Sequence, residues 1–208
     1  MDNKWNEYKK ILKIIEKYYP KECAFISQEY LDSKEYKKLK RIINDAVFFR
    51  QKEKEYYEMI CSIFSQYHVK RWDNMTYPCF QFSVLLHKNQ SILDDDVELM
   101  DELGGRRYNL EIFISRISNY FYVYTSEHIY CKEQIENWMF KSHSATFLLE
   151  KKYINRLRKE MKKIGMNKLN RTMAHIKIPF IETELLPSRN HEVEIFNCLF
   201  SDMVIDYY

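Results

Sequence analysis

Glycine and proline are scarce in this sequence. Only three of its 208 residues are glycine and four are proline. Flexible linkers between domains are rich in glycine, serine or proline, and no such stretch divides the chain. The sequence also contains no internal repeat. We therefore predict one domain that spans residues 1–208.

Long hydrophobic runs and paired cysteines are missing as well. A transmembrane helix needs roughly 20 predominantly apolar residues, and no stretch of the chain reaches that length. The opening MDNKWNEYKK has no apolar run of signal-peptide length. The five cysteines are odd in number, widely spaced and without a CxxC pair, a pattern typical of reduced thiols. These absences predict a cytoplasmic protein without a membrane segment.

The sequence lacks the short motifs that mark common catalytic and cofactor sites. It contains no HExxH, GxSxG, Walker loop or GxGxxG pattern. His128 and Cys131 are three residues apart, but zinc requires further ligands, and no second cluster has a suitable spacing. We interpret this pair as a core thiol beside a surface imidazole. The protein is predicted not to be an enzyme and to need no metal or cofactor, although an active site built from distant residues stays possible.

Apolar and aromatic residues are abundant. Hydrophobic residues make up 46% of the chain and aromatics 16%, with 17 Tyr and 13 Phe. This composition supplies a core, and the polar tip of tyrosine also suits interfaces. The 33 basic and 30 acidic residues give a net charge of +3. That balance is too even to predict nucleic-acid binding from the whole chain, so any electrostatic argument must be local.

Helical periodicity dominates the first third of the chain. Apolar residues at helical spacing predict a helix over residues 4–19, and Pro20 ends the pattern. A second helix is predicted to start at a capping-box pattern near Asp32 and to run toward Gln66. Its apolar pattern thins over residues 50–55, where we expect a break or kink.

After Pro78 the hydrophobic period changes from that of a helix to that of a strand. Residues 80–87 alternate as in a half-buried strand. Residues 108–125 give the clearest strand signal, and a turn at Ser118-Asn119 predicts a hairpin in which Phe113 pairs with Tyr124. One face of this hairpin is rich in tyrosine, while the opposite, aliphatic face is the better core. The tyrosine-rich face carries Phe113, Ile117, Tyr120, Tyr122 and Tyr124, and the aliphatic face carries Ile112, Ile114, Phe121 and Val123.

Helical patterns return over residues 127–140 and 144–164, and Gly165 is a natural residue to follow the second helix. Residues 193–200 alternate again and predict a final strand. The predicted order is N-terminal helices, a central antiparallel sheet with a hairpin near 108–125, further helices and a C-terminal strand. This order is typical of an α+β fold.

Cations cluster along the helix predicted over 144–164 and just beyond it. Nine basic residues and a single acid, Glu160, occur between Lys151 and Arg171. Most of the cations lie opposite an apolar stripe, so this face can bind phosphates or an acidic protein. An ordinary solvated face over a core stripe explains the same pattern. The candidate nucleic-acid face consists of Lys152, Arg156, Lys159 and Lys163.

An acidic stretch and the tyrosine-rich face of the hairpin are the other two candidate binding surfaces. The acidic stretch can meet a basic partner, and its spacing does not match a calcium loop. Exposed tyrosines on a rigid sheet are good interface anchors. A solvated connector and a helix-covered core face are the plainer interpretations of these two features. The candidate partner-binding residues are Asp94, Asp95, Asp96, Glu98, Asp101, Glu102, Arg106, Arg107, Tyr120, Tyr122 and Tyr124.

Two segments together resemble the immunity proteins encoded beside bacterial contact-dependent or polymorphic toxins. They are ELGGRRYNLEIFISRISNYFYVYT (102–125) and IPFIETELLPSRNHEVEIFNCLFSD (178–202), about a quarter of the chain. The shared features are a strand pair that ends in a tyrosine-rich segment and a tail of the form P-x-I-E-T-E … V-x-I-F-x-x-L-F-S-D. The resemblance implies that the protein binds one cognate toxin domain and blocks or distorts its active site without turnover. Such toxins are often basic nucleases, which the acidic stretch suits and the basic helix does not.

Our leading hypothesis is thus an immunity protein, with nucleic-acid binding by residues 151–171 as the alternative. The first hypothesis predicts that changing Asp94, Asp95 and Asp96 to lysine weakens toxin binding at low salt, because complementary charge speeds encounter and salt screens it. Titration calorimetry at two salt concentrations measures this effect, and circular dichroism checks that the fold is kept. Unchanged affinity contradicts the assignment of the acidic stretch.

Overall fold

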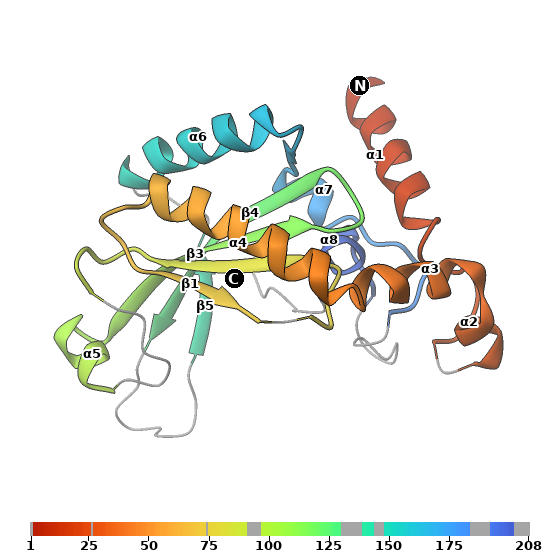
Figure 1. The fold of residues 1–208 in the computed structure, drawn as a ribbon, viewed down its shortest axis with the longest axis horizontal. Helices are drawn as coiled ribbons and strands as arrows, with labels where there is room; N and C mark the ends of the chain where they lie inside the picture. The colour runs from red at the N-terminus through yellow and green to blue at the C-terminus, as the bar shows by residue number, and fades with distance from the viewer. Residues whose placement is uncertain are drawn as a thin grey trace.

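The protein is an α+β fold, as the sequence predicts. A computed structural model describes residues 2–25, 27–73, 75–90, 97–129, 139–143, 148–183 and 192–201. Figure 1 shows the arrangement. The helices are α1 (Asp2–Ile15), α2 (Gln28–Asp32), α3 (Lys34–Ile43), α4 (Ala46–Ile63), α5 (Val97–Glu102), α6 (Leu148–Lys163), α7 (Arg171–Ala174) and α8 (Ile195–Leu199). The strands are β1 (Val69–Trp72), β2 (Cys79–Leu85), β3 (Arg106–Ser115), β4 (Tyr120–Ile129), β5 (Met139–His143) and β6 (Asn167–Lys168).

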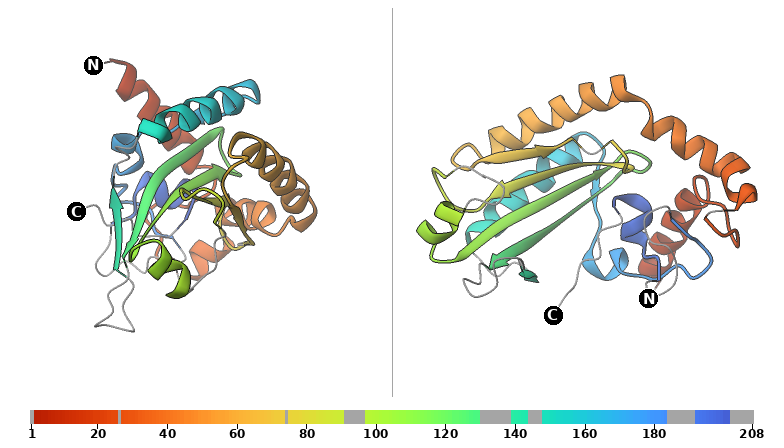
Figure 2. Two further views of the ribbon diagram at one scale, coloured as in Figure 1. Left: turned by 90° about the vertical axis from the view of Figure 1, so that its left-hand side faces the viewer. Right: turned by 90° about the horizontal axis from the view of Figure 1, so that it is seen from below.

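The described strands form one sheet with helices on both faces. Strands β1 to β5 lie in chain order and each pairs antiparallel with the next, while the short β6 pairs parallel with the start of β4. Helices α4 and α6 bury one hydrophobic cluster against one face of the sheet. Helices α1, α7 and α8 bury a second cluster against part of the other face. Figure 2 shows this layered arrangement from two further directions.

The β3–β4 hairpin has the predicted faces but not the predicted register. Phe113 pairs with Tyr122 and not with Tyr124, a shift of two residues. An even shift keeps every side chain on its own face, because side chains alternate with a period of two along a strand. The loop is longer than the predicted two-residue turn, and the Ser115 hydroxyl accepts the backbone N–H of Ser118 at 3.1 Å within it. Such a local hydroxyl bond stabilises a turn without the Asn-Gly signal.

The long helix predicted from Asp32 to Gln66 breaks earlier than expected. Residues 50–55 are helical, and the break lies between α3 and α4, at Asn44 and Asp45. The Asp45 carboxylate caps α4 by accepting the backbone N–H of Phe48 at 3.0 Å. The Arg116 guanidinium donates to the carbonyls of Ile42 and Ile43 at the end of α3. Because this donor comes from the distant hairpin loop, the local sequence gives no sign of it.

Two further predicted elements are wrong. Residues 195–199 form α8 and not a strand, and only an isolated bridge joins Glu194 to Lys177. Residues 195–200 are all buried, and a short run with apolar residues on every side has no period that separates strand from helix. The helix predicted over 127–140 is replaced by strand in its described parts, since β4 continues to Ile129 and β5 begins at Met139. The stretch between these two residues lies outside the described part of the chain.

Three smaller features bear on the predictions made from composition. Gly104 and Gly105 both adopt positive φ, at 71° and 78°, and form the tight turn into β3. Among the described cysteines, Cys23, Cys61, Cys79 and Cys198 form no disulfide bond. Within the described ranges, no helix is long and apolar enough to cross a lipid bilayer.

The buried hairpin predicts a clear contrast between two Phe→Ala substitutions. Phe113 is fully buried, and its ring centroid lies 5.3 Å from that of Phe196. Phe113→Ala is expected to lower the free energy of unfolding by about 3–5 kcal/mol, because it leaves a cavity in the core. The matched control Phe48→Ala removes a ring that is 43% exposed and should cost about 0.5 kcal/mol or less. Urea titrations followed by circular dichroism measure both values, and equal losses contradict the packing described here.

Candidate functional site

The tyrosine-rich face of the hairpin is mostly core. Tyr120 and Tyr122 are 8% and 2% exposed, and Tyr124 is half-buried. The Tyr122 ring lies 5.4 Å from that of Phe196 in α8, and its hydroxyl lies 3.3 Å from His175 Nε2. The expectation that this face lies partly open for a partner is therefore wrong for Tyr120 and Tyr122. A covering helix, the plainer interpretation, explains why the face is aromatic.

The other predicted partner-binding residues differ in their exposure, where the structure describes them. Asp94, Asp95 and Asp96 lie outside the described residues. Glu98, Asp101 and Glu102 belong to α5, where Asp101 and Glu102 are exposed. The exposed Arg106 donates to Glu127 Oε1 at 2.9 Å. Arg107 is only 8% exposed and lies beside His128 in the interior, which corrects its assignment as a contact residue.

A buried polar network occupies the part of the sheet that continues from Phe113 toward Arg107. Trp72 Nε1 in β1 donates to Ser83 Oγ in β2 at 2.8 Å, and the Ser83 hydroxyl donates to the Glu111 carboxyl group in β3. The Ser126 hydroxyl in β4 donates to the other oxygen of Glu111 at 3.1 Å. The network thus crosses four neighbouring strands.

His128 extends this network along β4. Its Nε2 lies 3.2 Å from Ser126 Oγ and 3.3 Å from Asn109 Nδ2, and its Nδ1 lies 3.4 Å from Arg107 Nη2. Burial, assisted by the charge of Arg107, lowers the pKa of His128 to about 4. Burial raises the pKa of Glu111, although hydrogen bonds from Ser83 and Ser126 oppose that rise. The imidazole is therefore neutral near pH 7.

Sequence reasoning missed this network. In the sequence, the network is marked by polar residues that recur with a period of two. They are Arg107, Asn109 and Glu111 in β3 and Ser126 and His128 in β4. In a nucleophilic triad the histidine lies between the acid and the serine. Here the Ser126 hydroxyl lies between Glu111 and His128, so the order differs. Among the described residues, no three His, Cys, Asp or Glu side chains converge as metal ligands.

A basic groove lies between α1 and α6. It encloses about 1120 Å³ of space, open solvent included. The cations on its lining are Arg158, Lys159 and Lys162 from α6 and Lys168 from β6, and Glu7 of α1 is the one acid of that lining. Burial and the nearby charge of Arg158 lower the pKa of Lys168. The remaining lining residues are Tyr120, Phe121, Asn155, Met166 and Asn167.

The cations that line the groove are mostly different from those of the predicted nucleic-acid face. Lys152, Arg156, Lys159 and Lys163 are all exposed on α6, but only Lys159 lines the groove. Lys163 donates to both oxygens of Glu160, at 2.9 and 2.8 Å. The groove residues of α6 are spaced three and four apart, as members of one helix face are. They form the side of α6 that faces α1, because Leu157 and Met161 hold the helix against the sheet.

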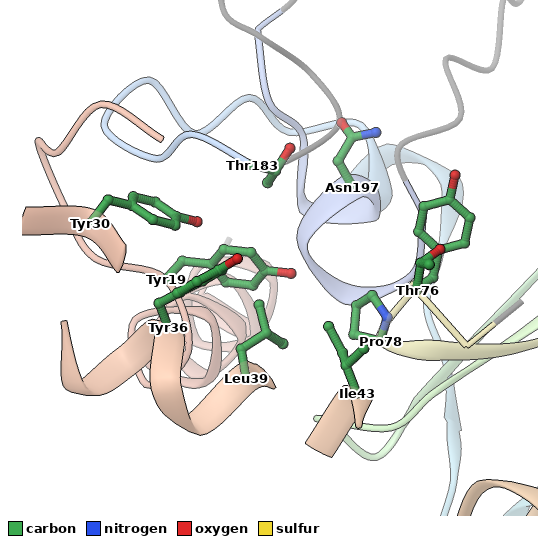
Figure 3. A pocket seen from close by; sticks show the side chains of 10 residues that line it. Tyr19, Tyr30, Tyr36, Leu39, Ile43, Thr76, Pro78, Thr183 and Asn197 are labelled. Carbon is green, nitrogen blue, oxygen red and sulfur yellow. The ribbon is translucent and has the colours of Figure 1, made fainter. Parts of the chain in front are cut away.

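A narrower pocket lies between the N-terminal helices and α8 (Figure 3). It encloses about 390 Å³, open solvent included. Tyr19 donates its hydroxyl to the Cys198 carbonyl at 2.8 Å, and Tyr30 donates to the Glu182 carbonyl at 3.1 Å. These hydrogen bonds connect the start of the chain to its C-terminal part, so we assign these two tyrosines a structural role. The lining is Tyr19, Tyr30, Tyr36, Leu39, Ile43, Thr76, Tyr77, Pro78, Thr183 and Asn197.

Comparison with known protein families, with characterised proteins and with solved structures finds no match for this chain. The resemblance of residues 102–125 and 178–202 to immunity proteins therefore gains no support from a matching relative.

The buried network predicts opposite pH effects for two substitutions. A histidine whose pKa is lowered by folding loses stabilisation as the pH falls from about 6.5 toward the folded value, here about 4. His128→Gln should therefore reduce the stability lost between pH 7.5 and pH 5 by about 2 kcal/mol. A carboxyl group whose pKa is raised by folding gains relative stabilisation as the pH falls, so Glu111→Gln should enlarge the same loss. Urea titrations at the two pH values measure both effects, and parallel pH profiles for all three proteins contradict the environments assigned to these groups.

Proposed function

We propose that this protein binds nucleic acid through the groove between α1 and α6. The observation that carries the proposal is the convergence of Arg158, Lys159, Lys162 and Lys168 from two elements onto one hollow surface whose lining holds a single acid. Cations that line a groove contribute phosphate contacts, which supply most of the affinity of non-specific nucleic-acid binding. The small net charge of the chain does not oppose this, because the relevant charge is local.

The environment of Lys168 favours the binding of an anion in the groove. Its ammonium is partly removed from water and lies near the Arg158 guanidinium, and both effects lower its pKa. A phosphate between these two cations would replace the lost hydration and relieve their repulsion. Asn155 and Asn167 supply neutral amide donors on the same lining. The groove therefore suits a phosphate chain better than the outer face of α6, where Lys163 is already paired with Glu160.

A second candidate function is neutralisation of a toxin domain, as the resemblance to immunity proteins implies. The two segments that carry the resemblance pack on each other, since Phe196 of the tail contacts Phe113 and Tyr122 of the hairpin. This packing supports treating the two segments as one unit. The aromatic residues through which the two segments contact each other are core residues. A toxin contact would therefore rest on other side chains, among them the exposed Asp101 and Glu102. Co-purification of a toxin domain with the wild-type protein would favour this candidate.

The groove predicts a loss of affinity when its charges are neutralised. The double variant Arg158→Gln, Lys162→Gln is expected to bind 20-nucleotide oligomers at least 10-fold more weakly at 50 mM salt. The slope of log affinity against log salt should shrink by about 1 for each phosphate contact that is lost. Fluorescence anisotropy with labelled RNA and DNA measures both quantities.

The matched control is Arg50→Gln, Lys54→Gln, which removes the same charges from exposed positions on α4. This variant should bind as the wild type does. Equal losses in the two double variants would show that net charge alone matters. Absence of binding to every oligomer at low salt would eliminate the proposed function.

A further inference from the structure

We infer that the nucleic acid bound by the groove is single-stranded, and that one of its bases stacks on Trp5 at the edge of α1. The inference rests on the function proposed above and names the form of the ligand. An aromatic surface lies on the other flank of α1, and the packing of the residues that the structure describes does not explain it.

Trp5 is an exposed aromatic platform. Its side chain is 58% exposed, whereas Ile11 and Ile15 of the same helix are fully buried. The ring stacks on that of Tyr8, with centroids 5.4 Å apart and planes inclined by 20°. The exposed Lys9 side chain places its ammonium over the Trp5 ring, 5.1 Å from the centroid, in a cation–π contact that a stacking base would displace. Trp5 is therefore held in a defined position by Tyr8 and still presents a large apolar surface to solvent.

A hollow adjoins this platform. It is bounded by α1 and by the chain around α7, and it encloses about 900 Å³ of space, open solvent included. The lining residues are Lys4, Trp5, Tyr8, Asn170, Thr172, Met173 and Ile176. Most of this lining is apolar or aromatic, with Lys4 as its one cation. Its composition suits the face of a base, and Lys4 can meet the adjoining phosphate.

The aromatic hollow and the basic groove flank the same helix. Glu7 lines the groove and Trp5 lines the hollow. Residues two apart on a helix point to nearly opposite sides, because each residue turns the helix by about 100°. A helix with its side chains is about 10–12 Å across, a distance that a few nucleotides cover. One strand can therefore cross α1, with phosphates near Arg158 and Lys162 and a base on Trp5.

This arrangement selects a single strand. Bases within a duplex are already stacked on both faces, so they cannot stack on a side chain unless the duplex is disrupted. A single strand offers free base faces, and aromatic stacking with a basic track is the usual way in which proteins bind it. Glu7, on the α1 side of the groove, repels phosphates toward the cations of α6 and β6.

The test compares Trp5→Leu with the wild type on three probes: a 12-nucleotide DNA strand, an RNA strand of the same sequence and the DNA duplex. Trp5→Leu keeps an apolar side chain but removes the flat ring. It is expected to weaken binding of one or both single strands by roughly 5- to 100-fold, with little change for the duplex. Trp5→Tyr should restore most of the affinity. The salt dependence should stay as in the wild type, because no phosphate contact is removed. A loss of affinity confined to the RNA strand or to the DNA strand would show which of the two nucleic acids stacks on Trp5.

Several outcomes would overturn the inference. If Trp5→Leu binds the single strands as tightly as the wild type does, or loses affinity for the duplex equally, the stacking assignment is wrong. In that case the proposed function still stands, provided that Arg158→Gln, Lys162→Gln weakens binding with a smaller salt slope. If poly-glutamate binds as tightly as the oligonucleotides and also depends on Trp5, the surface takes an acidic protein and both proposals fail.

Discussion

The packing of the β3–β4 hairpin on both of its faces is the constraint on which the rest of the structure depends. Ile112 and Ile114 point into the cluster beneath α4 and α6, while Phe113 and Tyr122 point into the cluster beneath α1, α7 and α8. The β3–β4 hairpin therefore contributes side chains to both clusters. Each helical layer is positioned by side chains that alternate along the same two strands. If the register of the hairpin changed by one residue, the side chains of the shifted strand would exchange faces. Neither helical layer would then meet a complementary sheet surface.

The polar network lies on the same sheet face as Phe113 and Tyr122, but further along the strands. Burying Glu111, Arg107 and His128 costs free energy, because each loses its hydration. Hydrogen bonds from Ser83 and Ser126 reduce this cost for Glu111, and the neutral state of the imidazole reduces it for His128, because no charge is buried there. Such a network also favours one strand alignment, because a shift in register would separate the hydrogen-bonded partners on neighbouring strands.

The basic groove follows from how α6 rests on the sheet. Leu157 and Met161 are fully buried, which orients the helix and leaves Arg158 and Lys162 toward α1. After α6 the chain returns to the sheet, where β6 pairs with the start of β4. Met166 and Lys168 of this segment line the groove. The same helix presents Lys152 and Arg156 to open solvent. Position relative to α1, and not charge alone, separates these two sets of cations.

The sequence by itself determined the α+β class, the first helix, the strand after Pro78, the hairpin with its two faces and the basic helix. These features depend on local periodicity, which a single segment carries whatever its neighbours are. It did not determine that residues 195–199 are helical or that β4 continues through His128, because a fully buried segment or a polar sheet face lacks the usual alternation. Tertiary structure alone decided that Tyr122 is covered, that Arg107 is buried and that Lys168 joins Arg158 in the groove. Each of these results depends on contacts between segments far apart in the chain, and no local pattern records which segment will cover which face.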